Sequence, residues 1–209
     1  MERLFCSFSY FSILPITVRF ISEHANLPFM LDLGLRAPDF RDLRATDGHS
    51  YSLSSFDSKP ILVVIFSCNH CPYVKAYEDR MVKIQGDYLP KGVQLIAINS
   101  NDDKSYPEDS FQEMVKRSKE KNFNFFYLRD PDQTVVDAYG AVCTPHVFAF
   151  DKERKLRYRG RIDDSKDPSM VNSPDLRNAI DDMLAGREVR HPDTRPFGCS
   201  IKWMVMPRS

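Results

Sequence analysis

The stretch of sequence that decides the fold is ILVVIFSCNHCPYV, residues 61–74. Its first half, Ile61 to Phe66, is a continuous apolar and mostly β-branched run, which is typical of a strand buried on both faces. Its second half holds two cysteines, Cys68 and Cys71, separated by two residues. Pro72 then fits the first turn of a helix, where its missing N–H has no partner to lose. The stretch predicts a buried strand that becomes a helix at a pair of cysteines.

The rest of the chain supplies the other elements of an α/β fold. Apolar residues after Pro72 recur at three- and four-residue steps as far as Tyr88, which predicts a helix. Asp47-Gly48 is a turn dipeptide and predicts an N-terminal β-hairpin. Further strands are expected at 93–99, 125–128, 142–150 and 156–162, and further helices at 111–121, 135–139 and 175–184. This order predicts a mixed central β-sheet with helices on both faces.

Length and composition limit the possible classes of protein. The 209 residues fit one domain with appendages: an extension over 1–29, a domain over 30–190 and a C-terminal tail over 191–209. Lys plus Arg and Asp plus Glu both total 29, so no basic surplus indicates binding to nucleic acid or to a membrane. Five cysteines are too sparse for a disulfide-stapled scaffold. They favour a cytoplasmic protein in which cysteine serves chemistry or packing.

The first 29 residues have two interpretations. Translation starts at Met30, directly before the domain, or the apolar segment is a weak leader that directs secretion or targeting. The segment is too short, and too interrupted by Pro15, to span a bilayer.

The cysteine pair indicates thiol–disulfide exchange. We expect the Cys68 sulfur to face the unpaired N–H groups of the helix, which lowers a thiol pKa. Cys68 would then attack a substrate and Cys71 would resolve the mixed disulfide. His70, when protonated, would stabilise the thiolate and make the couple less reducing. The alternatives are that His70 is an exposed loop residue and that the two cysteines are packing residues.

Three further positions are candidates for the site or its surroundings. Thr144-Pro145 begins a strand, a place where proline is permitted, and we expect this loop beside the cysteine pair. Cys143 is expected to be a small core residue, with a third redox thiol or a metal ligand as alternatives. Cys199 is expected to be structural, in a tail anchored by Trp203.

Several blocks of sequence together resemble a known family. They are residues 66–74 (FSCNHCPYV), 99–102 (NSND), 139–145 (YGAVCTP), 158–164 (YRGRIDD) and 198–203 (GCSIKW). These blocks are similar to the peroxiredoxin-like thioredoxin-fold family, within the redoxin (alkyl hydroperoxide reductase and thiol-specific antioxidant) superfamily. The resemblance runs from about Leu33 to Trp203. It implies a thioredoxin-like fold, Cys68 and Cys71 as the redox pair, and Pro145 as a cis-proline that shapes a substrate groove with Thr144.

The resemblance does not extend to a dedicated peroxidase. Peroxiredoxins place a threonine three residues, and a proline seven residues, before the peroxide-reactive cysteine. If Cys71 took that role, these positions would be Cys68 and Val64; if Cys68 did, they would be Ile65 and Ile61. Neither choice supplies the hydroxyl, so peroxidase activity is the less favoured alternative.

Two other functions remain open on the sequence. Cys68 and Cys71, with His70, Cys143 or His146, offer ligands for zinc or copper(I). A redox-inactive domain that presents the groove to a partner is a weaker alternative. The favoured prediction is an oxidoreductase without cofactor or bound metal, acting on a protein or small-molecule thiol or disulfide and coupled to a redox partner protein.

Overall fold

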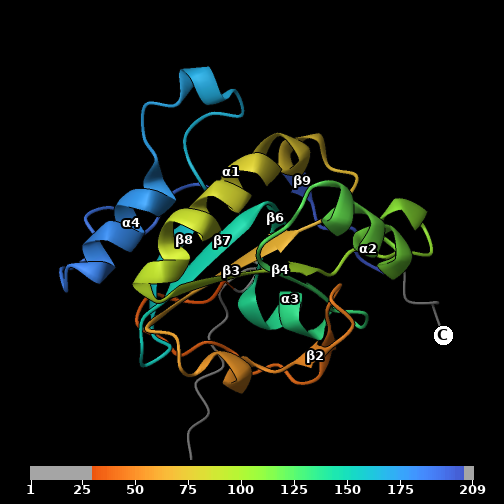
Figure 1. The fold of residues 1–209 in the computed structure, drawn as a ribbon, viewed down its shortest axis with the longest axis horizontal. Helices are drawn as coiled ribbons and strands as arrows, with labels where there is room; N and C mark the ends of the chain where they lie inside the picture. The colour runs from red at the N-terminus through yellow and green to blue at the C-terminus, as the bar shows by residue number, and fades with distance from the viewer. Residues whose placement is uncertain (1–29, 205–209) are drawn as a thin grey trace, which may run out of the picture.

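The computed structural model describes residues 30–204. A five-stranded mixed sheet in the order β5-β4-β3-β7-β8 forms its centre (Figure 1). β4 is parallel to both β3 and β5, whereas β7 runs antiparallel to both β3 and β8. The strands are β3 (Ile61–Ser67), β4 (Val93–Asn99), β5 (Phe126–Arg129), β7 (His146–Phe150) and β8 (Leu156–Gly160). The predicted mixed α/β sheet is confirmed.

Helices cover both faces of this sheet. The helices are α1 (Pro72–Tyr88), α2 (Phe111–Glu120), α3 (Thr134–Tyr139) and α4 (Asp175–Leu184). Apolar residues of α1, α2 and α4 pack into one hydrophobic cluster. Those of α3 pack into a second cluster with the N-terminal hairpin of β1 (Leu43–Arg44) and β2 (Ser50–Tyr51). Figure 1 shows α1 and α4 on one side of the sheet and α3 on the other.

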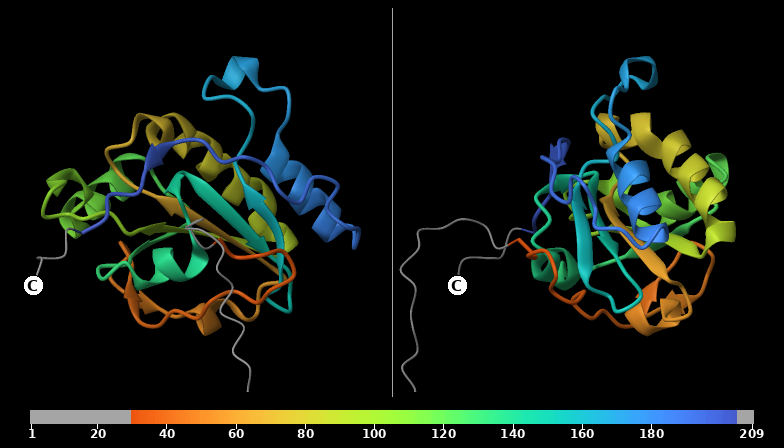
Figure 2. Two further views of the ribbon diagram at one scale, coloured as in Figure 1. Left: turned by 180° about the vertical axis from the view of Figure 1, so that it is seen from behind. Right: turned by 90° about the vertical axis from the view of Figure 1, so that its left-hand side faces the viewer.

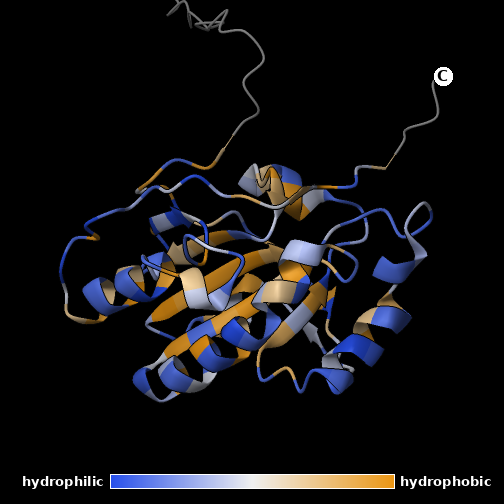
Figure 3. Ribbon diagram, turned by 90° about the horizontal axis from the view of Figure 1, so that it is seen from above, coloured by the Kyte–Doolittle hydropathy of each residue, from blue (hydrophilic) through white to orange (hydrophobic). Residues whose placement is uncertain are grey.

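The central strand β3 belongs to both clusters. Its alternate residues Ile61, Val63 and Ile65 face the α1 side, and Leu62, Val64 and Phe66 face the α3 side. All are at most 4% exposed, and burying each such side chain stabilises the fold by roughly 1.5–3 kcal/mol. In Figure 3 the strands are correspondingly apolar and the outer helix surfaces polar. Because β3 is held on both faces, the position where it ends is also fixed.

One predicted strand is divided in the structure. The expected strand over 142–150 consists of β6 (Cys143–Thr144) and β7, separated by Pro145, whose peptide bond with Thr144 is cis. β6 leaves the central sheet and pairs instead with β9 (Cys199–Ser200). Short 3-10 helices lie elsewhere: η1 (Leu53–Phe56), η2 (Leu89–Lys91), η3 (Pro107–Asp109) and η4 (Pro168–Met170).

The predicted tail is part of the domain. Residues 191–204, here called the C-terminal strap, run back across the molecule to β6 (Figure 2). The strap is anchored by Ile201, which is 5% exposed and belongs to the α3-side cluster. Trp203 is 47% exposed, so the expectation that it anchors the tail is wrong. Ile201 takes that place because its side chain, and not that of Trp203, reaches the apolar cluster.

Two other expectations concern the N-terminal extension and the membrane. The choice between a start at Met30 and a leader, and the environment of Cys6, lie outside the described residues. Within residues 30–204, no helix combines the length and apolar character needed to cross a bilayer.

The buried histidine of β7 makes stability depend on pH. His146 is fully buried, and burial, reinforced by the charge of Arg159, lowers its pKa to about 4. Below pH 6.5, His146 therefore binds a proton in the unfolded chain but stays neutral in the folded chain until the pH falls to about 4. We expect the free energy of unfolding to fall by about 2 kcal/mol from this residue alone between pH 6.5 and 5.

Urea unfolding at several pH values measures this effect. His146→Asn retains an acceptor for the Val142 N–H and should lose this part of the pH slope. The exposed His191 offers the matched control, because His191→Asn should keep it. Equal slopes in all three proteins would contradict the assignment.

Candidate active site

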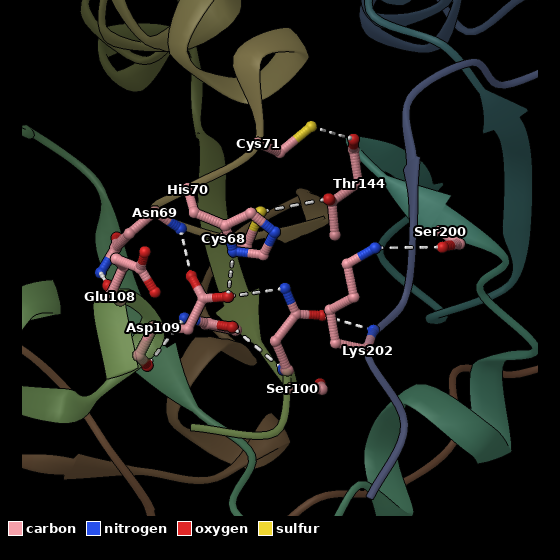
Figure 4. Close-up of polar contacts among 12 residues, drawn as sticks. Cys68, Asn69, His70, Cys71, Ser100, Glu108, Asp109, Thr144, Ser200 and Lys202 are labelled. Atoms are coloured by element: carbon pink, nitrogen blue, oxygen red, sulfur yellow. Dashed lines mark hydrogen bonds and ion pairs between the residues drawn. The ribbon is translucent and has the colours of Figure 1, made fainter. Parts of the chain in front are cut away.

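The two cysteines follow directly from the junction of β3 and α1. Cys68 comes immediately after the last residue of β3, and Cys71 is the N-cap residue of α1. Both are buried, at 2% and 0% exposure, and both are free thiols. Their sulfurs approach the same residue, since Cys68 Sγ lies 3.2 Å from the Thr144 hydroxyl and Cys71 Sγ 3.3 Å from the Thr144 carbonyl oxygen (Figure 4). The expectation that the Thr144-Pro145 loop lies beside the pair is met.

Cys71, not Cys68, is the N-cap residue of α1, and its side chain makes no capping hydrogen bond. The helix begins at Pro72, so Cys68 lies just after the strand, three residues before the cap. The expectation that the Cys68 sulfur faces the N–H groups of the helix stays a prediction.

The two thiols titrate as a coupled pair. The hydrogen bond with Cys68 lowers the pKa of Cys71 to about 4, against the opposing effect of burial, and contacts with Cys199 and Val74 lower it further. The same hydrogen bond, together with burial and the negative charge of Asp109, raises the pKa of Cys68 well above its usual value. Ionisation of Cys71 is therefore favoured over ionisation of Cys68.

Asp109 organises the loop between the cysteines and was missed by sequence reasoning. Its carboxylate is fully buried and accepts hydrogen bonds from the Asn69 N–H (2.6 Å) and from Asn101 Nδ2 (2.8 Å). It also contacts His70 Nδ1 at 2.6 Å. Asp109 lies in η3, in a polar, turn-rich stretch where no sequence signal separates it from its acidic neighbours. Its role depends on contacts across about 40 residues of chain.

His70 is held in place, and the alternative of a free loop residue is wrong. Besides its contact with Asp109, its ring stacks on Tyr106 with the centroids 5.2 Å apart and the planes 12° apart. Lys202 Nζ lies 5.5 Å from the centre of the same Tyr106 ring. The side chain of His70 remains 21% exposed, at the entrance to the pair.

The remaining two described cysteines differ in exposure and surroundings. Cys143 is buried, as expected of a core residue, and its S–H points to the carbonyl oxygen of Pro145 at 3.6 Å. Cys199, expected to be structural, is half-buried and packs against the small cluster formed by Cys68, Cys71 and Val74.

The predicted metal ligands are only partly brought together. Within residues 30–204, one group of three ligand atoms lies within 4.8 Å of one another, and it consists of Cys68, His70 and Asp109. His146 is outside this group, because its Nδ1 accepts the Val142 N–H inside the sheet. A metal at the three residues would have to compete with the hydrogen bonds that Asp109 already makes.

The reduced site should hold a thiolate down to acidic pH. Because the folded-state pKa of Cys71 lies below its ordinary value of 9.0, the thiolate stabilises the reduced protein fully above pH 9. This stabilisation is lost progressively as the pH falls through about 4. Titration of the ultraviolet thiolate absorbance should show this transition in the wild-type protein and in Cys143→Ser.

Two variants test the assignment to Cys71. Cys71→Ser should abolish the acidic transition, and Cys68→Ser should move it to higher pH by removing the hydrogen bond. An acidic transition that survives Cys71→Ser would contradict the assignment.

Comparison with known proteins agrees with this geometry. Residues 32–180 match the Redoxin family. A structure of an uncharacterized conserved protein from Geobacillus kaustophilus is 42% identical, with a TM-score of 0.80, covering 86% of this chain and 95% of that one. A hypothetical protein from Sinorhizobium meliloti is 38% identical, with a TM-score of 0.79, covering 85% and 98%.

One relative is named for its activity. The thiol-disulfide oxidoreductase ResA of Halalkalibacterium halodurans is 30% identical over 114 residues, which are 54% of this chain and 60% of that protein. The match therefore spans less than two thirds of the length of that relative. Since the family match covers most of the present sequence, the chain belongs to the redoxin family.

Proposed function

We propose that this protein is a thiol–disulfide oxidoreductase whose redox pair is Cys68 and Cys71. The observation that carries the proposal is the convergence of the two sulfurs on Thr144, with Cys68 Sγ 3.2 Å from its hydroxyl and Cys71 Sγ 3.3 Å from its carbonyl oxygen, at the place where a buried strand becomes a helix. Two buried free thiols directed at one residue are placed to form a disulfide when oxidised. Membership of the redoxin family and the activity of the similar ResA protein support this reading.

The proposed order of attack differs from the order expected from the sequence. The Cys71 thiolate attacks one sulfur of a substrate disulfide, a Cys71–substrate bond forms, and the other substrate sulfur leaves and takes a proton. Cys68 then attacks Cys71 Sγ, the Cys68–Cys71 bond forms, and the second substrate thiol is released with the Cys68 proton. The substrate gains two electrons and two protons: both electrons and the Cys68 proton come from the protein, and the proton taken by the first leaving sulfur comes from solvent. The lowered pKa of Cys71, caused chiefly by its interaction with Cys68, supports this order.

His70 and Asp109 act on the other sulfur of the pair. When the Cys68–Cys71 disulfide is reduced by attack at Cys71, Cys68 leaves as a thiolate and needs a proton. The His70 ring lies within 4.8 Å of Cys68 Sγ, and Asp109 holds it in that orientation. We assign to His70 the supply of this proton, and to Asp109 the positioning of the ring.

The strand pairing beside the cysteines limits the kind of substrate that can bind. β6 would offer a free strand edge beside the cysteines, but β9 already occupies that edge. An extended polypeptide would have to displace β9 before it could pair there, which supports small-molecule disulfides and exposed protein disulfides as substrates. A redox partner protein is needed to return the pair to its starting state. The proposed location is the cytoplasm, supported by the sparse use of cysteine.

A reaction with an aromatic disulfide reagent tests the order of attack. Cys68→Ser keeps the Cys71 nucleophile and should still release one coloured thiol per protein in a first, rapid step. Cys71→Ser should react only at the uncatalysed rate, because the remaining described thiols have raised pKa values. Cys143→Ser is the matched control and should behave as the wild-type protein does. The reverse pattern, with Cys71→Ser active and Cys68→Ser inactive, would restore the order expected from the sequence.

A glutathione redox series tests the function itself. Across the series, mass-resolved alkylation should show Cys68 and Cys71 oxidising together at one defined potential. Absence of this disulfide at every potential would reject the proposal. Hydrogen peroxide in place of the disulfide tests the less favoured peroxidase activity. The Thr144 hydroxyl contacts Cys68 instead of Cys71, so slow peroxide consumption is expected.

Metal binding is the second candidate function, because Cys68, His70 and Asp109 group three ligand atoms. The untreated protein should contain far less than one zinc or copper ion per chain. Stoichiometric metal that is lost in Asp109→Asn, with the fold retained by circular dichroism, would favour this second function.

A further inference from the structure

Cys199 lies on the side of the strap that faces the redox pair. β9 and β6 are antiparallel, with Cys199 opposite Thr144 and Ser200 opposite Cys143. Directly opposed residues in such a pair project to the same side. Thr144 is the residue that both sulfurs of the pair approach, so Cys199 points toward the same place. The packing of Cys199 against the cluster of Cys68, Cys71 and Val74 agrees with this register.

The strap holds Cys199 there from both directions along the chain. Before it, Gly198 lies so close to β6 that a Cβ would be 2.1 Å from the Thr144 carbonyl oxygen, and the Phe197 ring lies 6.0 Å from that of Tyr73. After it, the Lys202 N–H donates to Asn101 Oδ1 at 2.9 Å. The thiol is therefore presented by packed structure, which gives it a high effective concentration at the pair.

Cys199 is also the most accessible of the three thiols. Cys68 and Cys71 are at most 2% exposed, whereas Cys199 is only half-buried. A reductant that approaches from solvent meets Cys199 before it meets either member of the pair.

We propose that Cys199 is a third redox thiol, which replaces Cys68 as the disulfide partner of Cys71. This inference rests on the proposed function. In this step the Cys199 sulfur attacks Cys71 Sγ of the Cys68–Cys71 disulfide. The Cys71–Cys199 bond forms, the Cys68–Cys71 bond breaks, and Cys68 leaves as a thiolate that takes the proton given up by Cys199. The number of disulfides is unchanged, so no outside oxidant or reductant is needed. The oxidising equivalent moves from a buried position to a half-buried one.

The ionisation of Cys199 fits a thiol that acts after the pair is oxidised. Burial raises its pKa to about 11, and the hydrogen bond to Cys71 and the charge of the Cys71 thiolate contribute to the increase. Once Cys71 is in a disulfide it carries no charge, and these two contributions disappear. The charge of Lys202, which lowers the pKa of Cys199, remains. The thiol thus becomes a better nucleophile when there is a disulfide to attack.

The experiment uses the full chain with Cys68→Ser, treated with glutathione disulfide, quenched in acid and mapped by peptide mass spectrometry. Glutathione should first cap Cys71 and then be released as Cys199 attacks, which leaves a Cys71–Cys199 disulfide between tryptic peptides 45–75 and 191–202. Release should be at least about tenfold slower in Cys68→Ser/Cys199→Ser, where no neighbouring thiol faces Cys71. Cys68→Ser/Cys143→Ser is the matched control and should form the same cross-link at the same rate.

Three outcomes would overturn the inference: a stable glutathione adduct on Cys71 in folded Cys68→Ser, a Cys71–Cys143 disulfide, or equal release rates with and without Cys199. Circular dichroism and the midpoint of thermal unfolding establish that each variant is folded. The wild-type protein separates this inference from the proposed function. If it forms the Cys68–Cys71 disulfide while Cys68→Ser forms no Cys71–Cys199 bond, only the third thiol is rejected. If it forms no Cys68–Cys71 disulfide, the proposed function is rejected as well.

Discussion

The buried carboxylate of Asp109 is the contact on which the geometry of the site depends. A carboxylate removed from water is costly unless donors surround it, and here the loop between the cysteines supplies two of them, from Asn69 and His70. Asn101, after β4, supplies another. The charge that needs these donors therefore ties the cysteine loop to the neighbouring strand. The same charge lies close enough to Cys68 to disfavour a second negative charge there.

Two cysteines only three positions apart consequently have opposite electrostatic surroundings. Cys71 is the N-cap residue of a helix and its pKa is lowered, while Cys68 follows a strand and its pKa is raised in part by the charge of Asp109. In the proposed function, which sulfur attacks and which resolves follows from where strand and helix meet, and not from the order of the residues along the chain. β3, buried on both faces, keeps that junction in place.

Local patterns were enough to predict the elements that form the site, but not the contacts that adjust it. We could predict β3, α1 and α4 from the sequence because each element depends on residues that are neighbours in the chain. The place of Pro145 beside the cysteines came from the family resemblance and agrees with the structure. Asp109 and Cys199 could not be assigned, because their roles arise from partners about 40 residues away or more. The start of α1 at Pro72 was predicted, but the opposite pKa shifts of the two thiols were not, because they depend on contacts of the sulfurs with each other and with residues distant in the sequence.

The close approach of Gly198 to Thr144 also limits how the chain can be recombined with its relatives. With no room for a Cβ at residue 198, the loop at 143–145 and the strap can change only together. A chimera that received only the CNHC motif and the loop at 143–145 would lack the strap that covers the motif. A domain cut at residue 190 would likewise expose the edge of β6 as an unpaired strand, which is a surface prone to self-association. In evolution and in protein engineering, the loop at 143–145 and the strap must therefore change together, although they are separate in the sequence.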